Sequence, residues 1–262
     1  MGKTRLFTFG CSHTQYRWPS WANILGLSFK EFYNLGQTGS GIFYMVYQFV
    51  YANEYFKFKK DDTLIFMLSD EARIDIIKQN DWLVNGLAFN SKDVFGEKLF
   101  EHYTLTHAVE STYIFLYLLK KELENIGCNY EIIYAFPPII SKDDKFADDK
   151  LKSIWSKKFN LTNTKIKSLT EFAEKDNTMN DCYSFYKNKL PMYYTDSHFS
   201  VLTHLGYVKK YLSKYYDNKH DDIVKDWHHK VPVDRDESEL DNVFNNILDK
   251  NRVKFVNGVY IT

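Results

Sequence analysis

The chain has 262 residues, enough for one large domain with its own core. Lysine plus arginine and aspartate plus glutamate both total 34, so the formal net charge is zero, which argues against a nucleic-acid partner. The 3 cysteines lack metal-ligand spacing and leave one unpaired in any disulfide scheme, which favours a reducing compartment. No signal-peptide core follows the first residues, and no apolar run reaches the ~20 residues of a membrane span. We therefore expect a cytoplasmic protein without a membrane partner.

Short apolar runs with the composition of buried strands alternate with segments of helical periodicity. The predicted strands cover residues 6–9, 29–35, 63–68 and 130–136, and the predicted helices cover residues 18–25, 42–56, 107–126 and 201–216. In the longest predicted helix the apolar residues step by three and four, and Gly127 stands where a helix C′ glycine belongs. Strands interleaved with helices predict an α/β fold of three layers, with a central parallel sheet covered on both faces.

Two stretches interrupt this alternation and predict insertions in a domain that covers residues 1–216. Residues 73–106 are long for a connection and mix aromatic residues with Asn and Asp, so we expect them beside the carboxyl edge of the sheet. Residues 141–160 are polar and partly helical, which indicates a second cap element or a solvated helix. Residues 217–262 alternate in charge and end in the strand-like VKFVNGVYIT, so we interpret them as a tail or a small appendage.

Polar residues stand where the predicted strands end and where the last predicted helix begins. The first strand ends in GCSHT, which places Ser12 directly behind it. NLGQTGSG, residues 34–41, follows the second strand, and LSDEAR, residues 68–73, follows the third. TDSH, residues 195–198, precedes the last helix. Because the carboxyl ends of parallel strands meet at one edge of a sheet, we expect these residues to share a crevice there.

The residue types in this crevice are those of a nucleophilic triad. Ser12 supplies a hydroxyl, His198 an imidazole and Asp196 a carboxylate, and the glycines allow backbone N–H groups to approach an oxyanion closely. The serine comes first and the Asp-His pair last, unlike the order in chymotrypsin-like and subtilisin-like proteases. The serine is also outside any G-x-S-x-G elbow, so the common α/β-hydrolase arrangement is absent.

The four motifs together resemble those of the SGNH, or GDSL-type, hydrolases, a family of esterases and acylhydrolases. GCS matches the family's Gly-Asp-Ser block with Cys11 in place of Asp, and NLGQTG matches its Asn-x-Gly-x-x-Gly block. The resemblance implies a flavodoxin-like three-layer architecture that needs neither metal nor cofactor. It also implies that Ser12 is the nucleophile, His198 the base and Asp196 its orienting partner, with the N–H groups of Ser12 and Gly39 forming the oxyanion hole.

The third and fourth motifs depart from the family pattern. Ser69 or Asp70 stands where the family has its oxyanion asparagine, and an ionised Asp70 would repel a developing oxyanion. Arg73 is a candidate replacement donor or a ligand for a substrate carboxylate, and the alternative is an ion pair with Glu71 or Asp75. The last motif places Asp196 two residues before His198 instead of three, which is similar to D-x-H-P-S variants in relatives whose first block reads GCSFT.

Structural interpretations compete with each of these roles. Ser12 could simply cap the following helix, and Cys11 could be a reactive thiol, although the strand alternation indicates that it packs as a small apolar residue. The glycines of residues 36–41 could hold a phosphate, but they lack the spacing of the dinucleotide and P-loop motifs. His204 fits a structural role on the last helix. The other candidate metal ligands, His220, His228 and His229, lack ordered spacing.

We therefore predict a serine esterase that cleaves an O-acyl ester of a small molecule or glycan, with O-acetyl on a carbohydrate as the expected group. The competing prediction is an impaired scaffold of the same fold that binds a glycan or a protein, and a third is an enzyme that depends on Cys11. Scarce arginine beside abundant lysine and asparagine suits an AT-rich genome, including a viral one, and would then allow association with a virion.

Overall fold

The structure is a computed structural model of the chain. It describes residues 4–16, 18–71, 73–78, 81–87, 104–138, 153, 157, 168–175, 198–230, 254–256 and 259–261. Apart from residues 153 and 157, the predicted insertion at residues 141–160 lies outside the described residues.

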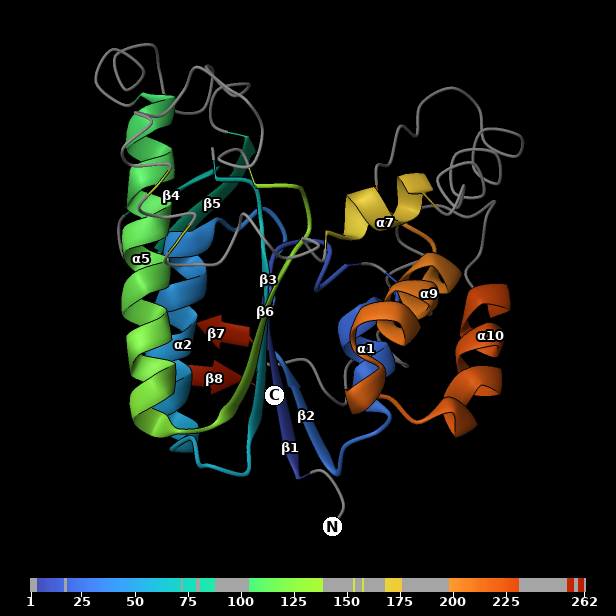
Figure 1. The fold of residues 1–262 in the computed structure, drawn as a ribbon. Helices are drawn as coiled ribbons and strands as arrows, with labels where there is room; N and C mark the ends of the chain where they lie inside the picture. The colour runs from blue at the N-terminus through green and yellow to red at the C-terminus, as the bar shows by residue number, and fades with distance from the viewer. Residues whose placement is uncertain are drawn as a thin grey trace.

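Four parallel strands form the central sheet, in the order β2-β1-β3-β6 (Figure 1). They are β1 (Arg5–Gly10), β2 (Glu31–Asn34), β3 (Thr63–Leu68) and β6 (Asn129–Tyr134). The α/β prediction with a parallel sheet is therefore confirmed, and the strands lie within about two residues of their predicted bounds. The chain leaves β1 for β2 on one side and returns to β3 on the other, so the strand order reverses between β1 and β3. In open α/β sheets this is where ligands bind, outside the carboxyl ends of the strands.

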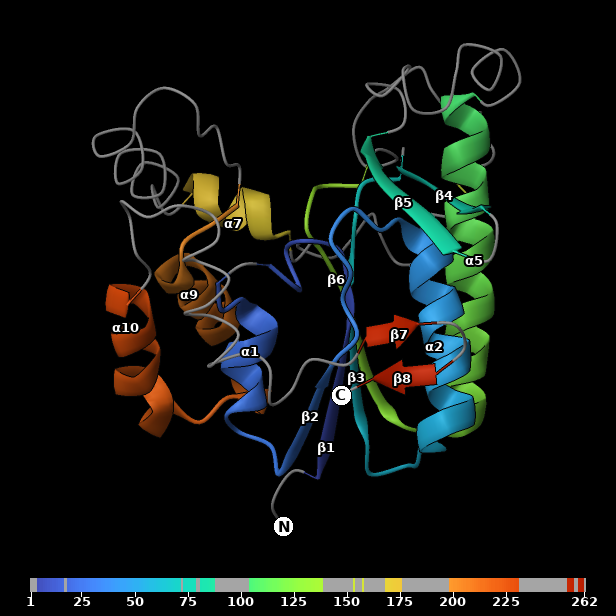
Figure 2. The ribbon, with the colours of Figure 1, turned by 180° about the vertical axis from the view of Figure 1, so that it is seen from behind.

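Helices lie on both sides of the sheet (Figures 1 and 2). One face is covered by α2 (Ile42–Phe56) and α5 (Leu105–Ile126). The other side holds α1 (Trp21–Gly26), α7 (Leu169–Lys175), α9 (Val201–Tyr211) and α10 (Asp221–Lys230). Two short 3₁₀ turns, Ser213–Tyr215 and Asn218–His220, connect α9 to α10. The predicted three-layer arrangement is thus present in the described part of the chain.

Capping residues explain where the helices begin and end. α2 has its predicted bounds, and α5 ends at Gly127, which has φ 72° and donates its N–H to the Leu123 carbonyl at 3.0 Å. α1 begins at Trp21, later than predicted, because Ser20 caps it and receives the Ala22 N–H at 3.3 Å. α9 ends at Tyr211, earlier than predicted, because the following residues turn into a 3₁₀ helix whose Tyr215 is buried in the core.

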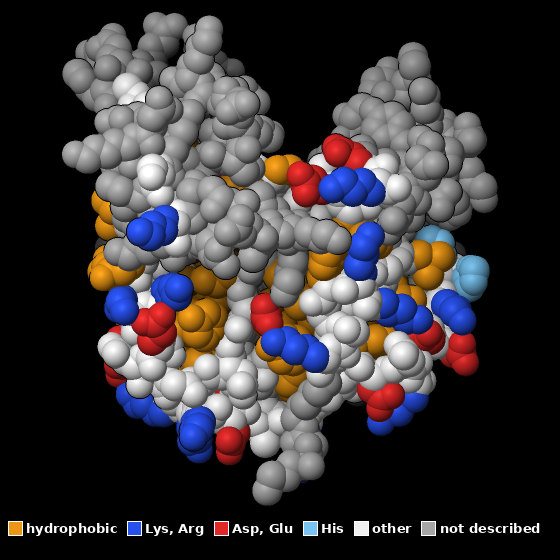
Figure 3. Space-filling model, viewed as in Figure 1, with side chains coloured by type: hydrophobic (Ala, Val, Ile, Leu, Met, Phe, Trp, Pro, Cys, Tyr) orange, Lys and Arg blue, Asp and Glu red, His pale blue; other side chains and the backbone are white. Residues whose placement is uncertain are grey.

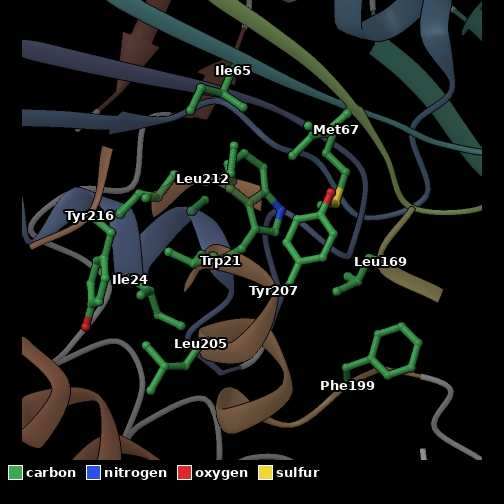
Figure 4. Close-up of a cluster of buried hydrophobic side chains, with 14 of the residues drawn as sticks. Trp21, Ile24, Ile65, Met67, Leu169, Phe199, Leu205, Tyr207, Leu212 and Tyr216 are labelled. Carbon is green, nitrogen blue, oxygen red and sulfur yellow. The ribbon is translucent and has the colours of Figure 1, made fainter. Parts of the chain in front are cut away.

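Side chains that alternate along the strands fill two separate cores. Leu6, Ile65 and Met67 face α1 and α9, where Trp21 and Tyr207 fill the space between the layers (Figure 4). The core against α2 and α5 is rich in phenylalanine. Its rings include Phe7, Phe9, Phe49, Phe58 and Phe66. Cys11 is fully buried in the first core, in agreement with its predicted role as a small apolar residue.

The predicted insertion after β3 begins with an antiparallel hairpin. Its strands are β4 (Arg73–Lys78) and β5 (Asp81–Leu87), with a register shift between Arg73 and Ile74. The hairpin lies at the end of the sheet where the parallel strands terminate, above α2 (Figure 1). A second hairpin near the C-terminus pairs β7 (Lys254–Val256) with β8 (Val259–Ile261), within the stretch predicted to form strands.

The described surface agrees with the balanced charge of the sequence. On the face shown in Figure 3, basic and acidic side chains are interspersed instead of gathered by sign. Exposed ion pairs on the described surface include Lys57 with Glu54 and Lys225 with Asp222. None of the helices in the described segments has the length and apolar character required to cross a bilayer.

Candidate active site

A tight turn at the end of β1 carries Ser12 and His13. The Cys11 carbonyl accepts the N–H groups of Thr14 at 2.8 Å and Gln15 at 3.1 Å. Gly10 permits this turn, because a Cβ on it would lie 2.1 Å from Thr14 Oγ1 and 2.8 Å from the Met67 carbonyl oxygen. The turn is enclosed, since Ser12 is only 5% and His13 only 3% exposed.

The glycine-rich loop after β2 folds back over this turn. Asn34 donates from Nδ2 to the Thr14 carbonyl at 3.0 Å, and its Oδ1 accepts the Gly36 N–H at 3.1 Å. Gln37 N–H donates to the Gly10 carbonyl at 2.8 Å, which holds the loop against the end of β1. Gly39 has φ 84°, a left-handed conformation that favours glycine. The two motifs that the sequence analysis placed at this edge therefore lie in contact.

The segment that contains His198 reaches the same turn from the other end of the chain. The His198 ring stacks on Tyr16 with 3.7 Å between ring centroids, and its centroid lies 4.9 Å from that of His13. Trp18 Nε1 donates to the Phe199 carbonyl at 2.8 Å, and Ser200 caps α9 by accepting the Thr203 N–H at 3.2 Å. The imidazole is therefore held between a packed turn and an anchored helix.

The complete triad stays a prediction. Asp196 lies outside the described residues. For the two members that are described, the structure gives contacts of His198 with the turn that carries Ser12, but it describes no hydrogen bond between the Ser12 hydroxyl and the imidazole.

Two further histidines close to His198 are deeply buried. Burial lowers the pKa of His13 well below the usual histidine value, and the nearby His198, His204 and Arg73 lower it further. Burial also lowers the pKa of His204 to about 3, with a smaller contribution from His198. Both rings are therefore neutral at pH 7. His204 lies on α9 with its ring buried in the protein, in agreement with the structural role predicted for it.

The turn after β3 brings Arg73 back over the glycine loop. The Arg73 N–H donates to the Asp70 carbonyl at 3.2 Å, and Arg73 Nη1 donates to the Ser40 carbonyl at 3.2 Å. Ser40 in turn donates from Oγ to the Gly10 carbonyl at 3.1 Å. Ser69 is only 8% exposed, whereas Asp70 is partly exposed. Among the described residues, Arg73 forms no ion pair with Glu71 or Asp75.

Glu71 and Asp75 lie close to Arg73 in the sequence. In the structure they bond to α5 and α2, the two helices that cover one face of the sheet. Tyr113 of α5 donates its hydroxyl to Glu71 Oε1 at 3.2 Å. Asp75 caps α2, since its carboxylate oxygens accept the N–H groups of Gly41 at 2.7 Å and Tyr44 at 2.8 Å. Burial raises the pKa of Asp75 to about 6, although these two hydrogen bonds partly oppose the rise.

Sequence reasoning missed the capping role of Asp75. The available signal was that α2 follows Gly41, which has no side chain to cap the helix, so an acceptor must come from elsewhere. In the described part of the chain, no group of three or more His, Cys, Asp and Glu side chains is placed to hold a metal ion. The described residues bring a hydroxyl, an imidazole and hydrogen-bond donors to one edge of the sheet.

Comparisons with known proteins add a distant structural similarity. No protein-family model matches the sequence, and no curated protein matches it. Among solved structures, the chain is similar to a member of the lipolytic protein G-D-S-L family from Veillonella parvula, at 13% sequence identity and a TM-score of 0.37. The match covers 80% of this chain and 97% of that one.

Proposed function

We propose that the protein is a serine ester hydrolase with Ser12 as nucleophile and His198 as general base. The observation that carries this proposal is that two segments 186 residues apart meet at one turn, where the His198 ring lies 4.9 Å from that of His13, the residue after Ser12. The meeting point lies at the strand-order reversal between β1 and β3, where α/β folds bind their ligands. The four motifs that resemble those of SGNH hydrolases support the same assignment.

The proposed reaction is acyl transfer in two halves. Ser12 Oγ attacks the ester carbonyl carbon while His198 takes the hydroxyl proton, and the carbonyl electron pair moves to the oxygen. That oxyanion accepts the N–H groups of Ser12 and Gly39. When the carbonyl re-forms, the C–O bond to the alcohol breaks and the alcohol leaves with the proton from His198. Water then attacks the acyl-enzyme in the same way, and Asp196 keeps the imidazole oriented.

The proposed substrate is an O-acyl ester, with O-acetyl on a carbohydrate as the first candidate. Aromatic rings lie beside His198 and His13, and sugars stack on such rings. Tyr16 stacks on His198, while Phe199 and Phe136 contact His13 at centroid distances of 5.5 Å and 5.2 Å. Ser69, Asp70 and Arg73 border the same edge and are the candidate substrate-binding residues.

Active-site labelling tests the nucleophile directly. Wild-type protein should react with a fluorophosphonate probe and hydrolyse p-nitrophenyl acetate, and Ser12→Ala should lose both activities. Ser213→Ala is the matched control, because Ser213 is an exposed serine at the far end of α9. Equal hydrolysis by wild type and Ser12→Ala would dismiss Ser12 as the nucleophile. Unchanged activity in Cys11→Ala would exclude the enzyme that depends on Cys11, whose buried thiol an alkylating reagent need not reach.

A binding module of the same fold is the second candidate function. It is favoured by the third motif, which places Ser69 and Asp70 where the resemblance leads one to expect an amide donor. This alternative predicts an unlabelled Ser12 together with binding of an acetylated oligosaccharide that survives Ser12→Ala. Titration calorimetry on both proteins separates the two functions.

A further inference from the structure

Between the end of β3 and the start of β4, two buried hydrogen-bond donors have no partner among the described residues. They are the hydroxyl of Ser69 and Nε of Arg73. Buried polar groups are nearly always paired, because an unmade hydrogen bond leaves the cost of desolvation uncompensated. Two such donors within five residues therefore point to a bound group that accepts hydrogen bonds.

One hydrogen bond and two electrostatic interactions locate the Arg73 guanidinium. Nη1 is fixed on the carbonyl of Ser40, the residue after Gly39. The guanidinium charge contributes to the lowered pKa of His13, the residue after Ser12. It also opposes part of the rise that burial causes in the pKa of Asp75 on β4. Arg73 therefore lies on the glycine loop, near enough to the turn that carries the proposed nucleophile for its charge to act on His13.

Strand register places Ser69 at the same point. Gly10 pairs with Met67 in the β1–β3 ladder. Ser12 and Ser69 each follow that pair by two residues, just after the ends of the neighbouring strands β1 and β3 at the strand-order reversal. The two donors and the proposed nucleophile thus share one edge of the sheet.

We propose that Arg73, together with Ser69, donates hydrogen bonds to the oxyanion formed when Ser12 attacks the ester carbonyl. This inference rests on the proposed function and assigns a third and fourth donor beside the N–H groups of Ser12 and Gly39. A guanidinium carries five N–H donors in a fixed plane and stays protonated, so a bond from Nη1 to Ser40 leaves Nε–H and other donors for the ligand.

The donors act without changing their own covalent state. As the carbonyl becomes a C–O⁻ group, its oxygen gains a full negative charge and accepts stronger hydrogen bonds. When the tetrahedral intermediate collapses, the electron pair returns to the C=O bond and Arg73 keeps its protons. Interactions that strengthen only in the transition state raise kcat and leave substrate binding nearly unchanged.

The test measures kcat and KM on p-nitrophenyl acetate for Arg73→Ala, Arg73→Gln and Ser69→Ala, per Ser12 labelled by fluorophosphonate. We expect Arg73→Ala to lower kcat by about 10²-fold to 10³-fold with little change in KM, and Ser69→Ala to lower kcat less. Added guanidinium ion should restore part of the activity of Arg73→Ala, which a lost structural contact would not explain. Arg73→Gln, which keeps an N–H donor, should retain more activity than Arg73→Ala.

Arg5→Gln is the matched control. Arg5 is a part-buried arginine at the opposite end of β1, paired with Asp62 at 2.6 Å, so its loss should lower stability and leave kcat unchanged. The thermal unfolding midpoint of each variant shows whether it is folded, and Arg73→Gln replaces Arg73→Ala if the latter does not fold. A kcat near the wild-type value in the folded Arg73 variant overturns the inference, as does a loss confined to KM. Wild type that is neither labelled nor active overturns the proposed function itself.

Discussion

The buried histidines and the buried carboxylates near the proposed site lie on opposite sides of the sheet. On the side of α1 and α9 are the histidines His13 and His204. On the side of α2 and α5 are the carboxylates, Glu71 bonded to Tyr113 and Asp75 bonded to the first N–H groups of α2. Burial disfavours the charged form in both places, so it lowers the pKa of the bases and raises that of Asp75.

This difference gives the two faces opposite responses to pH. A buried base with a lowered pKa makes folding less favourable in acid, because the unfolded chain binds the proton more tightly. A buried acid with a raised pKa makes folding more favourable in acid for the converse reason. The proposed active site lies where the two faces meet at the sheet edge. In the wild type the two faces make opposite contributions to the pH dependence of the free energy of unfolding. Single substitutions on each face should therefore measure the two contributions separately.

The largest effect is expected from His204→Gln. The pKa of His204 is about 3 in the folded protein against 6.5 for an unperturbed histidine, so its contribution is present above pH 6.5 and is lost as the pH falls toward 3. At about 1.4 kcal/mol per pH unit, the loss reaches about 3 kcal/mol at pH 4. The difference in unfolding free energy between wild type and His204→Gln should shrink by that amount between pH 7 and pH 4, as measured by urea denaturation.

His220→Gln is the control for this measurement, because His220 is a partly exposed histidine in the 3₁₀ turn before α10. It controls for the loss of one imidazole from the protein. If the unfolding free energies of His204→Gln and wild type change with pH in parallel, burial of the His204 ring does not make stability depend on pH. The contrast between the two faces would then be wrong for the α1 and α9 side.

The opposite slope should come from Asp75. Its pKa is about 6 in the folded protein against 3.8 when unperturbed, so its contribution is fully present below about pH 4 and is lost as the pH rises through 6. The span corresponds to about 3 kcal/mol at most. In Asp75→Asn this dependence disappears, and wild type should lose stability relative to the variant as the pH rises from 4 to 7.

Asp222→Asn provides the matched control on α10, where the carboxylate side chain is 95% exposed. It controls for the loss of one carboxylate from the protein. The two hydrogen bonds to Asp75 favour its charged form, so a profile for Asp75→Asn that parallels wild type would mean that these bonds cancel the cost of burial.

Much of the fold could be predicted from local pattern. Residues 42–56 and 63–68 have the predicted bounds, because an amphipathic or fully apolar run fixes its own secondary structure. The hairpin of β4 and β5 was read only as an insertion, although Ile74 and Ile76 alternate with Arg73 and Asp75 in the period of a strand. A short alternating stretch does not reveal whether a partner strand follows.

The candidate site was less accessible to sequence reasoning. The positions of Ser12, the glycine loop and Ser69 directly after predicted strands indicate that they share one edge of the sheet, because parallel strands all end at the same edge. The stacking of His198 on Tyr16 and the cap that Asp75 provides to Gly41 depend on tertiary contacts between distant residues. No local pattern in either segment encodes its partner.

The smallest effect tests whether the buried carboxylates on the side of α2 and α5 are stabilised by particular hydrogen-bond donors. Tyr113→Phe removes the hydroxyl that donates to Glu71 at 3.2 Å, and a hydrogen bond to a buried charged group contributes about 2 kcal/mol. Urea denaturation at pH 7 should show that loss with an unchanged denaturant slope, because the packing of the ring is retained. Tyr134→Phe is the control, since Tyr134 lies near enough to Glu71 for the carboxylate to raise its pKa, yet no hydrogen bond between the two is described. If the two variants lose equal stability, this side of the sheet is stabilised by general burial and not by the hydroxyl of Tyr113.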